Sequence, residues 1–247
     1  IMALMTGGMA TIAGGVMAAY AGMLKDAGFD RGAGDLMAAS IMSAPASLVM
    51  AKIMVPEIEE SETRGDCRVR LEREGTNLLD GICIGAADGM KLSINVMAML
   101  IAFTALVYLA NTVLGGLGSL VGIDGLKLED MLGWLCQPFA LAMGISPEDA
   151  PRVGAILGKR TILNEFFGYL DLAAALQGEH PISPRSASIT TYALCGFANF
   201  ASIAIQIGGI GSLVPSRRMD LAKHGLRAMI GGTLASYMTA NIAGALL

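Results

Sequence analysis

The sequence predicts an all-α integral membrane fold, with about five transmembrane helices and one re-entrant helical hairpin. Three observations support this class. Of the 247 residues, 54% are hydrophobic and only 15% are charged, whereas a soluble domain carries about 25% charged residues. The charged residues are also segregated, so that long stretches of the chain contain none. Finally, 32 glycines are typical of helices that pack closely within a bilayer.

Five stretches are apolar enough to be membrane spans, for which a helix needs about 20 apolar residues. The longest charge-free runs have 32 residues (92–123) and 31 residues (186–216), so both are long enough to tilt or break. The predicted spans are about 1–24, 36–54, 90–123, 186–213 and 224–247. Residues 74–91 are expected to form an amphipathic interfacial helix that leads into the third span.

The segment 128–178 is predicted to be the re-entrant hairpin. Two apolar stretches, 131–145 and 161–170, flank a polar stretch that contains Pro147 and Pro151. Each apolar stretch is too short to cross a bilayer. Two short arms around a polar tip therefore indicate a segment that enters and leaves on the same side of the membrane.

Basic residues predict the orientation, because they gather in cytoplasmic loops. Two loops are rich in them: the loop after the second span (Lys52, Arg64, Arg68, Arg70, Arg73) and the loop after the fourth (Arg217, Arg218, Lys223, Arg227). The loop after the first span has only Lys25 and Arg31, against three aspartates. The first two loops are therefore expected in the cytoplasm and the third outside.

Composition and motif spacing argue against several other classes. The chain has 17 basic and 21 acidic residues, so no broad basic surface is available for nucleic acid. The cysteines and histidines are scattered without metal-ligand or disulfide spacing; they are Cys67, Cys83, Cys136, Cys195, His180 and His224. Without a nucleophile–base pair or a metal cluster, we expect neither an enzyme nor a cofactor.

A short internal repeat links the first and fourth predicted spans. Residues 10–13 (ATIA) resemble residues 201–204 (ASIA), and both lie among small residues. In the predicted orientation the two spans run in opposite directions, so the match has the form of an inverted repeat. Transporters built this way bind their solute and coupling ion where broken helices meet at mid-membrane. The fold class is therefore expected to be half of an inverted-repeat transporter.

Polar side chains inside the apolar segments are the candidate binding residues. Glu165 begins the second hairpin arm, and buried charges in membranes are usually functional; alternatively, it only caps that helix. Asn199 and Ser202 would share one face of a continuous helix, or lie where the helix unwinds; alternatively, they only bond neighbouring helices. A carboxylate, an amide and a hydroxyl suit a neutral, hydroxyl-rich solute. Thr11 is a candidate ligand for Na⁺, which prefers oxygen.

Several stretches of the chain resemble the concentrative nucleoside transporters. In the family's order they are residues 6–14 (TGGMATIAG), Ala44-Pro45 with Pro56-Glu57, and residues 164–166 (NEF), 191–200 (TYALCGFANF) and 213–218 (LVPSRR). The resemblance extends over essentially the whole chain. It implies uptake of nucleosides, driven by Na⁺ or H⁺, through an elevator motion. It also implies a homotrimer among the lipids of the plasma membrane, or of the inner membrane in a bacterium.

The same resemblance implies residue roles. Glu165, Asn199 and Ser202 would hold the ribose hydroxyls, and Phe197 would line the same pocket. Val16 would touch the nucleobase, and Thr11 would belong to the sodium site. The family's first hairpin is expected upstream of residue 1, so that the chain would be the C-terminal, transport-core half with the N-terminal part missing.

Two alternatives remain open at this stage. In the first, the transporter is coupled to H⁺, with Glu165 as the proton carrier, although Thr11 favours Na⁺. In the second, the chain is a channel-like or purely structural membrane domain. A pore would repeat polar residues along one face of a span, whereas here they gather at one depth.

Overall fold

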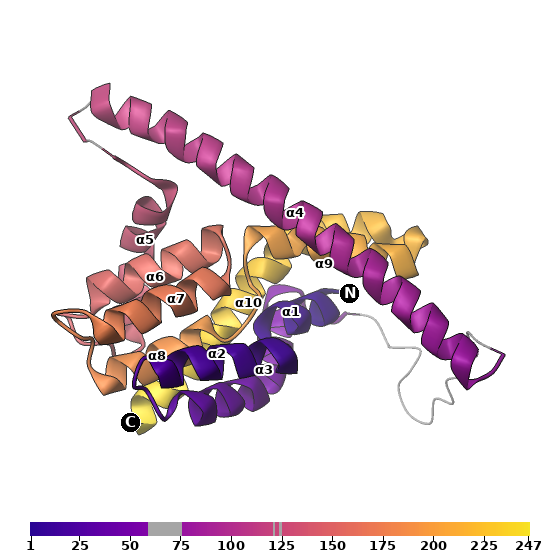
Figure 1. Cartoon of the computed structure of the whole chain (residues 1–247), viewed down its shortest axis with the longest axis horizontal. Helices are drawn as coiled ribbons and strands as arrows, with labels where there is room; N and C mark the ends of the chain where they lie inside the picture. Colours follow the sequence, from indigo (N-terminus) through magenta and orange to yellow (C-terminus); the bar gives the residue numbers. More distant parts are fainter. Residues whose placement is uncertain (59–75, 121, 124) are drawn as a thin grey trace.

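Every regular element in the described part of the chain is a helix. The computed structural model describes residues 1–58, 76–120, 122–123 and 125–247 (Figure 1). The elements are α1 (Met2–Ala10), α2 (Gly14–Asp26), α3 (Gly32–Met54), α4 (Leu78–Leu120), α5 (Leu128–Ala142), α6 (Ala150–Ile162), α7 (Glu165–Gln177), α8 (Pro184–Leu194), α9 (Phe200–Leu213), η1 (Pro215–Arg217) and α10 (Arg218–Leu246). Arg64, Arg68, Arg70, Arg73 and Cys67 lie outside the described residues. Two described stretches are long and apolar enough to cross a membrane, Met2–Asp26 and Gly32–Met54.

The first predicted span is a broken helix rather than a continuous one. Residues 11–13 are not helical, and Thr11 and Ala13 have extended backbones. The hydroxyl of Thr11 donates to Gly7 O at 2.8 Å, and its N–H donates to the same oxygen at 3.2 Å. Glycines on both sides of the break lower the helical preference of the segment. The result is two helices, α1 and α2, joined by extended backbone.

The fourth predicted span is also broken, between α8 and α9. Ser183 caps the start of α8, and Asn199 caps the start of α9 by accepting from Ser202 N–H at 2.9 Å. Residues 195–199 between the two helices are not helical. The repeat predicted from sequence does not align with these breaks. Residues 10–13 include the first break, whereas residues 201–204 lie within α9, after the second break.

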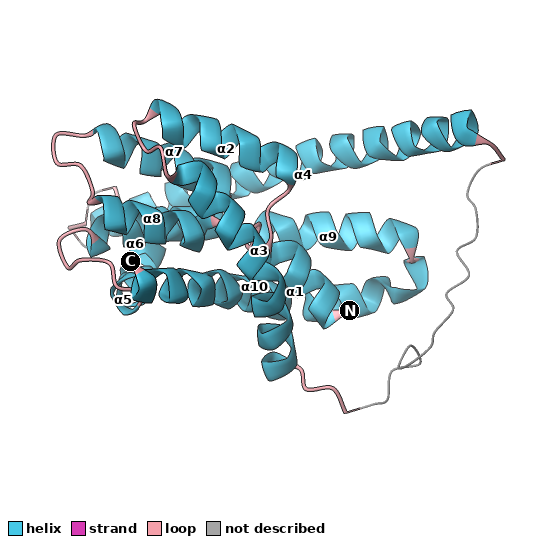
Figure 2. Cartoon of the chain, turned by 90° about the horizontal axis from the view of Figure 1, so that it is seen from below, coloured by secondary structure: helices cyan, strands magenta, loops and turns pink. Residues whose placement is uncertain are grey.

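Helix α4 differs from the predicted third span. A single helix of 43 residues begins at Leu78, so no separate interfacial helix precedes the span. Lys91 and Asp88 are exposed on this helix and pair with each other at 3.4 Å. Because charged residues at i and i+3 support a helix, this polar stretch does not end it. Figures 1 and 2 show α4 extending well beyond the rest of the molecule, with α9 beside it.

The predicted hairpin contains three helices, α5, α6 and α7, instead of two arms. The stretch predicted as the polar tip is helical from Ala150, because Pro151 occupies the first turn of α6, where proline needs no N–H partner. The chain is non-helical at 143–149, which includes Pro147 of the predicted tip, and it breaks a second time at Leu163, after which Asn164 caps α7. Glycines bring α5 and α6 together: a Cβ on Gly158 would lie 2.6 Å from Gly133 N.

Asp149 joins the start of α6 to the start of α8. Its carboxylate accepts from the N–H of Ser183 at 3.2 Å and from the hydroxyl of Ser183 at 3.0 Å. We expect Asp149→Ala to lower the free energy of unfolding by about 1–2 kcal/mol, because two hydrogen bonds to a charged acceptor are lost. Thermal unfolding in detergent measures this. The control is Glu148→Ala, which alters the exposed neighbouring carboxylate; an equal shift in the two variants would contradict the prediction.

Helix α10 lies at the centre of the fold and contacts α1, α3, α8 and α9. Small residues on α10 allow this approach. A Cβ on Gly232 would lie 2.8 Å from Met9 Cβ, and one on Gly225 would lie 2.6 Å from Ile203 Cγ2. Helices in membranes commonly pack through such small residues. The core formed this way holds the two broken helices against each other.

Candidate functional site

The two helix breaks meet at one place. Gly196, in the α8–α9 break, has φ +149°, and a Cβ there would lie 2.8 Å from Met9 O and 2.9 Å from Ala10 O. Only glycine allows the backbone of one break to approach the end of α1 so closely. The unwound segments are therefore neighbours, although about 185 residues separate them in sequence.

Glu165, Asn199 and Ser202 form one hydrogen-bonded cluster, which we call the carboxylate–amide cluster. Asn199 Nδ2 donates to Glu165 Oε2 at 3.3 Å. Asn199 Oδ1 accepts from the N–H of Ser202 at 2.9 Å and from its hydroxyl at 3.0 Å. The three side chains are 4%, 2% and 6% exposed. Hydrogen bonds between groups this deeply buried are stronger than those exposed to water.

The geometry answers two local questions left open by the sequence: which residue caps α7, and where the helix before Ser202 unwinds. Asn164, not Glu165, is the capping residue of α7, because its side chain accepts from Phe167 N–H at 3.3 Å. Glu165 occupies the first helical position, where the helix dipole favours a negative charge. Asn199 and Ser202 do not share the face of a continuous helix. They are the cap and the third residue of α9, immediately after the unwound segment.

Tyr20 completes the cluster, and the sequence analysis did not select it. Its hydroxyl donates to Glu165 Oε1 at 2.9 Å, so that both carboxylate oxygens are engaged. Its ring stacks on Tyr169, with centroids 4.3 Å apart. Tyr20 could have been selected from the sequence as the lone tyrosine in an apolar segment, since a buried phenol usually needs a hydrogen-bond partner.

The other predicted site residues lie around the breaks without joining this cluster. Phe197 is half-buried in the α8–α9 break, and its carbonyl accepts from Asn199 N–H at 3.0 Å. Val16 is half-buried on α2, one turn before Tyr20. Thr11 lies in the α1–α2 break. Among the described residues, no hydrogen bond joins Thr11 to the carboxylate–amide cluster.

Arg160 is a second residue that the sequence analysis did not select for the site. It is completely buried in α6, although it was assigned to a polar tip. Its neighbour Lys159 is partly exposed and pairs with Asp171 at 2.8 Å. Consecutive helical residues point about 100° apart, so Arg160 faces the core while its neighbour Lys159 reaches the surface.

The described residues contain no group of three or more His, Cys, Asp or Glu side chains suited to a metal ion. Cys83, Cys136 and Cys195 are free thiols. Any cation near the break would therefore have oxygen ligands such as the Thr11 hydroxyl and backbone carbonyls. The hydroxyl of Thr11 donates to Gly7 O, which leaves its oxygen lone pairs available as acceptors.

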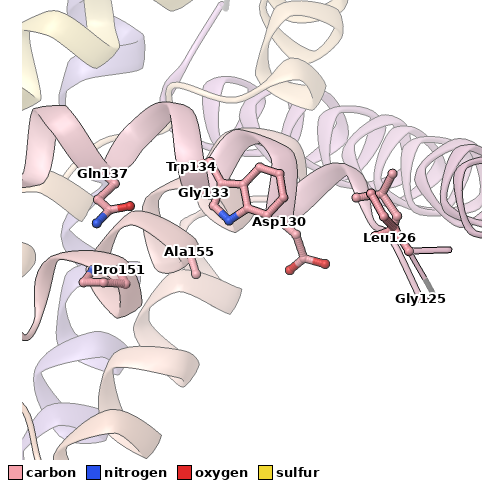
Figure 3. Close-up of a pocket in the computed structure, with 9 residues that line it drawn as sticks. Gly125, Leu126, Asp130, Gly133, Trp134, Gln137, Pro151 and Ala155 are labelled. Atoms are coloured by element: carbon pink, nitrogen blue, oxygen red, sulfur yellow. The ribbon is translucent and has the colours of Figure 1, made fainter. Parts of the chain in front are cut away.

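A cavity of about 320 Å³ between α5 and α6 is separate from the candidate site. Figure 3 shows Trp134 and Gln137 on α5 and Pro151 on α6 along its wall, with Asp130 near the start of α5. None of the sequence-predicted site residues lines this cavity.

The carboxylate–amide cluster offers a set of acceptors and donors at the point where two helices begin. Glu165 can accept from hydroxyls, and Asn199 can both donate and accept. The present partners of Glu165 are a phenol and an amide, both neutral. A neutral solute with adjacent hydroxyls can donate to the remaining lone pairs of this carboxylate, while Tyr20 and Asn199 hold it in place. The arrangement is suited to reversible binding.

Known proteins are similar to this chain over nearly its whole length. A family model described as "Na+ dependent nucleoside transporter C-terminus" matches residues 35–244. The chain is 44% identical over 247 residues to an uncharacterized transporter of Haemophilus influenzae, covering 99% of this chain and 58% of that protein. It is 42% identical over 255 residues to sodium/nucleoside cotransporter 1 of Rattus norvegicus, covering 98% and 38%. The chain thus spans little more than half the length of the first relative.

Solved structures of CNTnw have the same fold. A CNTnw variant in an intermediate 3 state is similar, with a TM-score of 0.87 and 36% identity over 99% of this chain and 58% of that one. CNTnw in an inward-facing substrate-bound state gives a TM-score of 0.78 and 37% identity, covering 98% and 56%.

Proposed function

Because the chain belongs to the family of Na⁺-dependent nucleoside transporters, we propose that it forms the transport core of a symporter that carries nucleosides across the plasma membrane, or across the inner membrane of a bacterium. The process makes and breaks no covalent bond. Solute and cation would stabilise the same movable state, so that the ion gradient drives uphill uptake.

The carboxylate–amide cluster is the observation that supports this proposal best. Glu165 and Asn199 lie at the starts of two different helices, α7 and α9, and bond each other at 3.3 Å. A ribose presents two adjacent hydroxyls, which match a carboxylate and an amide placed side by side. We assign ribose binding to Glu165, Asn199 and Ser202, with Phe197 lining the pocket and Val16 contacting the nucleobase.

Sodium is the proposed coupling ion, with Thr11 among its ligands. Support comes from the unwound backbone at Thr11, since extended segments expose carbonyl oxygens that hard cations prefer. A proton is the alternative, because Glu165 is a buried carboxyl group that could carry one. Sodium coupling and proton coupling predict different results, because only sodium coupling makes uptake depend on Na⁺.

The exposed surface of α4 supports the proposed assembly. Large apolar side chains are exposed along its length, among them Leu79, Ile101, Tyr108, Leu109 and Leu120. Such a surface requires lipid or another protein to cover it. We propose that α4 is a scaffold element facing lipid and the other subunits of a homotrimer. The α5–α6–α7 segment would include the re-entrant hairpin and move with α1, α2, α8 and α9 as an elevator.

The direct test is nucleoside uptake into vesicles by the protein produced from its whole reading frame. Radiolabelled uridine and adenosine uptake are compared with an inward Na⁺ gradient, with an H⁺ gradient and with neither. Uptake that requires the Na⁺ gradient supports the proposal, and uptake driven by H⁺ alone replaces the coupling ion. No uptake under either gradient, from folded protein, contradicts nucleoside transport.

Tyr20→Phe is expected to weaken nucleoside binding moderately. The variant keeps the ring that stacks on Tyr169 but removes the hydroxyl that donates to Glu165. Loss of one hydrogen bond to a charged group changes binding by about 1.5–3 kcal/mol at most, so we expect KM for uridine to rise roughly tenfold with a smaller change in maximal rate.

The control for this variant is Tyr108→Phe, since Tyr108 is 77% exposed on α4. Initial rates of uptake over a range of uridine concentrations separate KM from maximal rate. The assignment of Tyr20 to the site would be wrong if both phenylalanine variants had the same KM as the wild type.

A further inference from the structure

We infer that Arg160 is a built-in cation for the break between α8 and α9, occupying the position that a bound metal ion would otherwise take. The side chain is completely buried, and its Nη2 donates to Gly196 O at 3.3 Å and to Ser236 Oγ at 3.5 Å. The Ser236 hydroxyl lies 3.1 Å from Cys195 O and also 3.1 Å from Gly232 O of its own helix, so its one proton is shared between these two acceptors. The guanidinium and one hydroxyl thus reach the two carbonyls that begin the unwound segment.

The charge at this position has a physical reason. The last carbonyls of a helix lack internal partners, and the helix dipole makes that end negative. Helix α8 ends at Leu194, and the carbonyls of Cys195 and Gly196 follow directly after this negative helix end, inside the protein. A cation is the appropriate group there, because a buried carbonyl without a partner is costly. Arg160 provides one from a different helix, α6.

Glu165 is the opposite charge in the same region. The guanidinium of Arg160 and the carboxylate of Glu165 attract each other electrostatically without a direct ion pair, and Glu165 makes its hydrogen bonds to Tyr20 and Asn199. In the described part of the chain, Nε and Nη1 of Arg160 have no hydrogen-bond partner. Arg160 therefore acts mainly as a positive charge between Glu165 and the end of α8, and less as a hydrogen-bonding fork.

The break between α1 and α2 has a different arrangement. Its carbonyls at Met9 and Ala10 face the α-carbon of Gly196, and within the described ranges no hydrogen-bond donor reaches them. The two breaks thus differ: one has a cation supplied by the protein, and the other has none. One consequence rests on the proposed function. A transporter with this arrangement would couple to one mobile cation, bound at the α1–α2 break, because Arg160 already neutralises the α8–α9 break.

The test uses chemical rescue in the complete transporter. Arg160→Ala removes the charge and opens a space that guanidinium can enter, whereas Arg160→Met fills the space without charge. We expect Arg160→Ala to unfold roughly 5–10 °C lower than wild type in detergent, because a buried charge partner is lost. Millimolar guanidinium should restore most of that difference in Arg160→Ala and none in Arg160→Met. Arg152→Ala is the control, since Arg152 is the exposed arginine of the same helix.

The outcomes are distinguishable from failure of the proposed function, because thermal unfolding involves no nucleoside. The inference is overturned if Arg160→Met is as stable as wild type, or if folded Arg160→Ala is not stabilised by guanidinium. Should Arg160→Ala not fold, Arg160→Lys must be more stable than Arg160→Met; equal stability overturns the inference. In vesicles, uptake by the wild type should depend hyperbolically on Na⁺, and Arg160→Ala should acquire a sigmoidal dependence as Na⁺ enters the vacated position. If uptake depended hyperbolically on Na⁺ in both proteins, Arg160 would not be the reason why a single cation is coupled.

Discussion

Glu165→Gln is expected to abolish nucleoside uptake while leaving the protein folded. Glutamine has nearly the same shape but presents an NH₂ group where Glu165 accepts from Tyr20 or Asn199. It also loses the charge that makes these hydrogen bonds, and those to a ribose, strong. Two charge-assisted hydrogen bonds are worth about 3–6 kcal/mol in total, which corresponds to a reduction in affinity of at least roughly 100-fold. Initial rates of radiolabelled uridine uptake in vesicles measure the effect.

Glu148→Gln is the matched control for this prediction. It makes the same chemical change in an exposed residue just before α6, and it should transport like the wild type. The prediction also tests the coupling ion: if Glu165 carried a proton, Glu165→Gln could still exchange nucleoside across the membrane without any gradient. Wild-type uptake by Glu165→Gln would exclude the carboxylate–amide cluster as the ribose site.

Gly196→Ala is expected to have the second-largest effect, by forcing the two breaks apart. Its φ of +149° is a conformation that a side chain disfavours, and the new Cβ would overlap Met9 O and Ala10 O. Backbone strain and overpacking each cost about 1–3 kcal/mol. The same shift would displace Gly196 O from Arg160. We expect a lower unfolding temperature and loss of uptake, measured by thermal unfolding in detergent and by the vesicle assay.

Gly208→Ala provides the comparison, because it lies within α9 and an added Cβ would meet nothing within 4 Å. Alanine in a helix interior is favoured over glycine by about 0.5–1 kcal/mol. This variant should therefore be as stable as the wild type or slightly more so, and should transport normally. If the two alanine variants were equally stable, the close contact at Gly196 would have no energetic importance.

Local sequence was sufficient for much of the fold. The chain is helical as expected from its apolar stretches, and residues 36–54 lie within α3. The errors arose where local rules compete. A polar stretch with prolines was predicted to be a tip, yet Pro151 is compatible with the first turn of a helix, so α6 forms there. The start of α4 was placed too late, because exposed charges do not end a helix that contains no proline. The helix begins just after Asn77, whose side chain accepts from Asp80 N–H at 2.9 Å.

The family, the helical class and three members of the carboxylate–amide cluster could be predicted from the residues alone. These depend on residue type and short motifs: a glutamate after a capping asparagine, and an asparagine followed three residues later by a serine. The packing of the helices was needed to show that Tyr20 and Arg160 belong to the same region. Tyr20 lies 145 residues from Glu165, and Arg160 lies 36 residues from Gly196. Such partners are selected by how α2, α6 and α8 pack together, and no local pattern encodes a contact between distant helices.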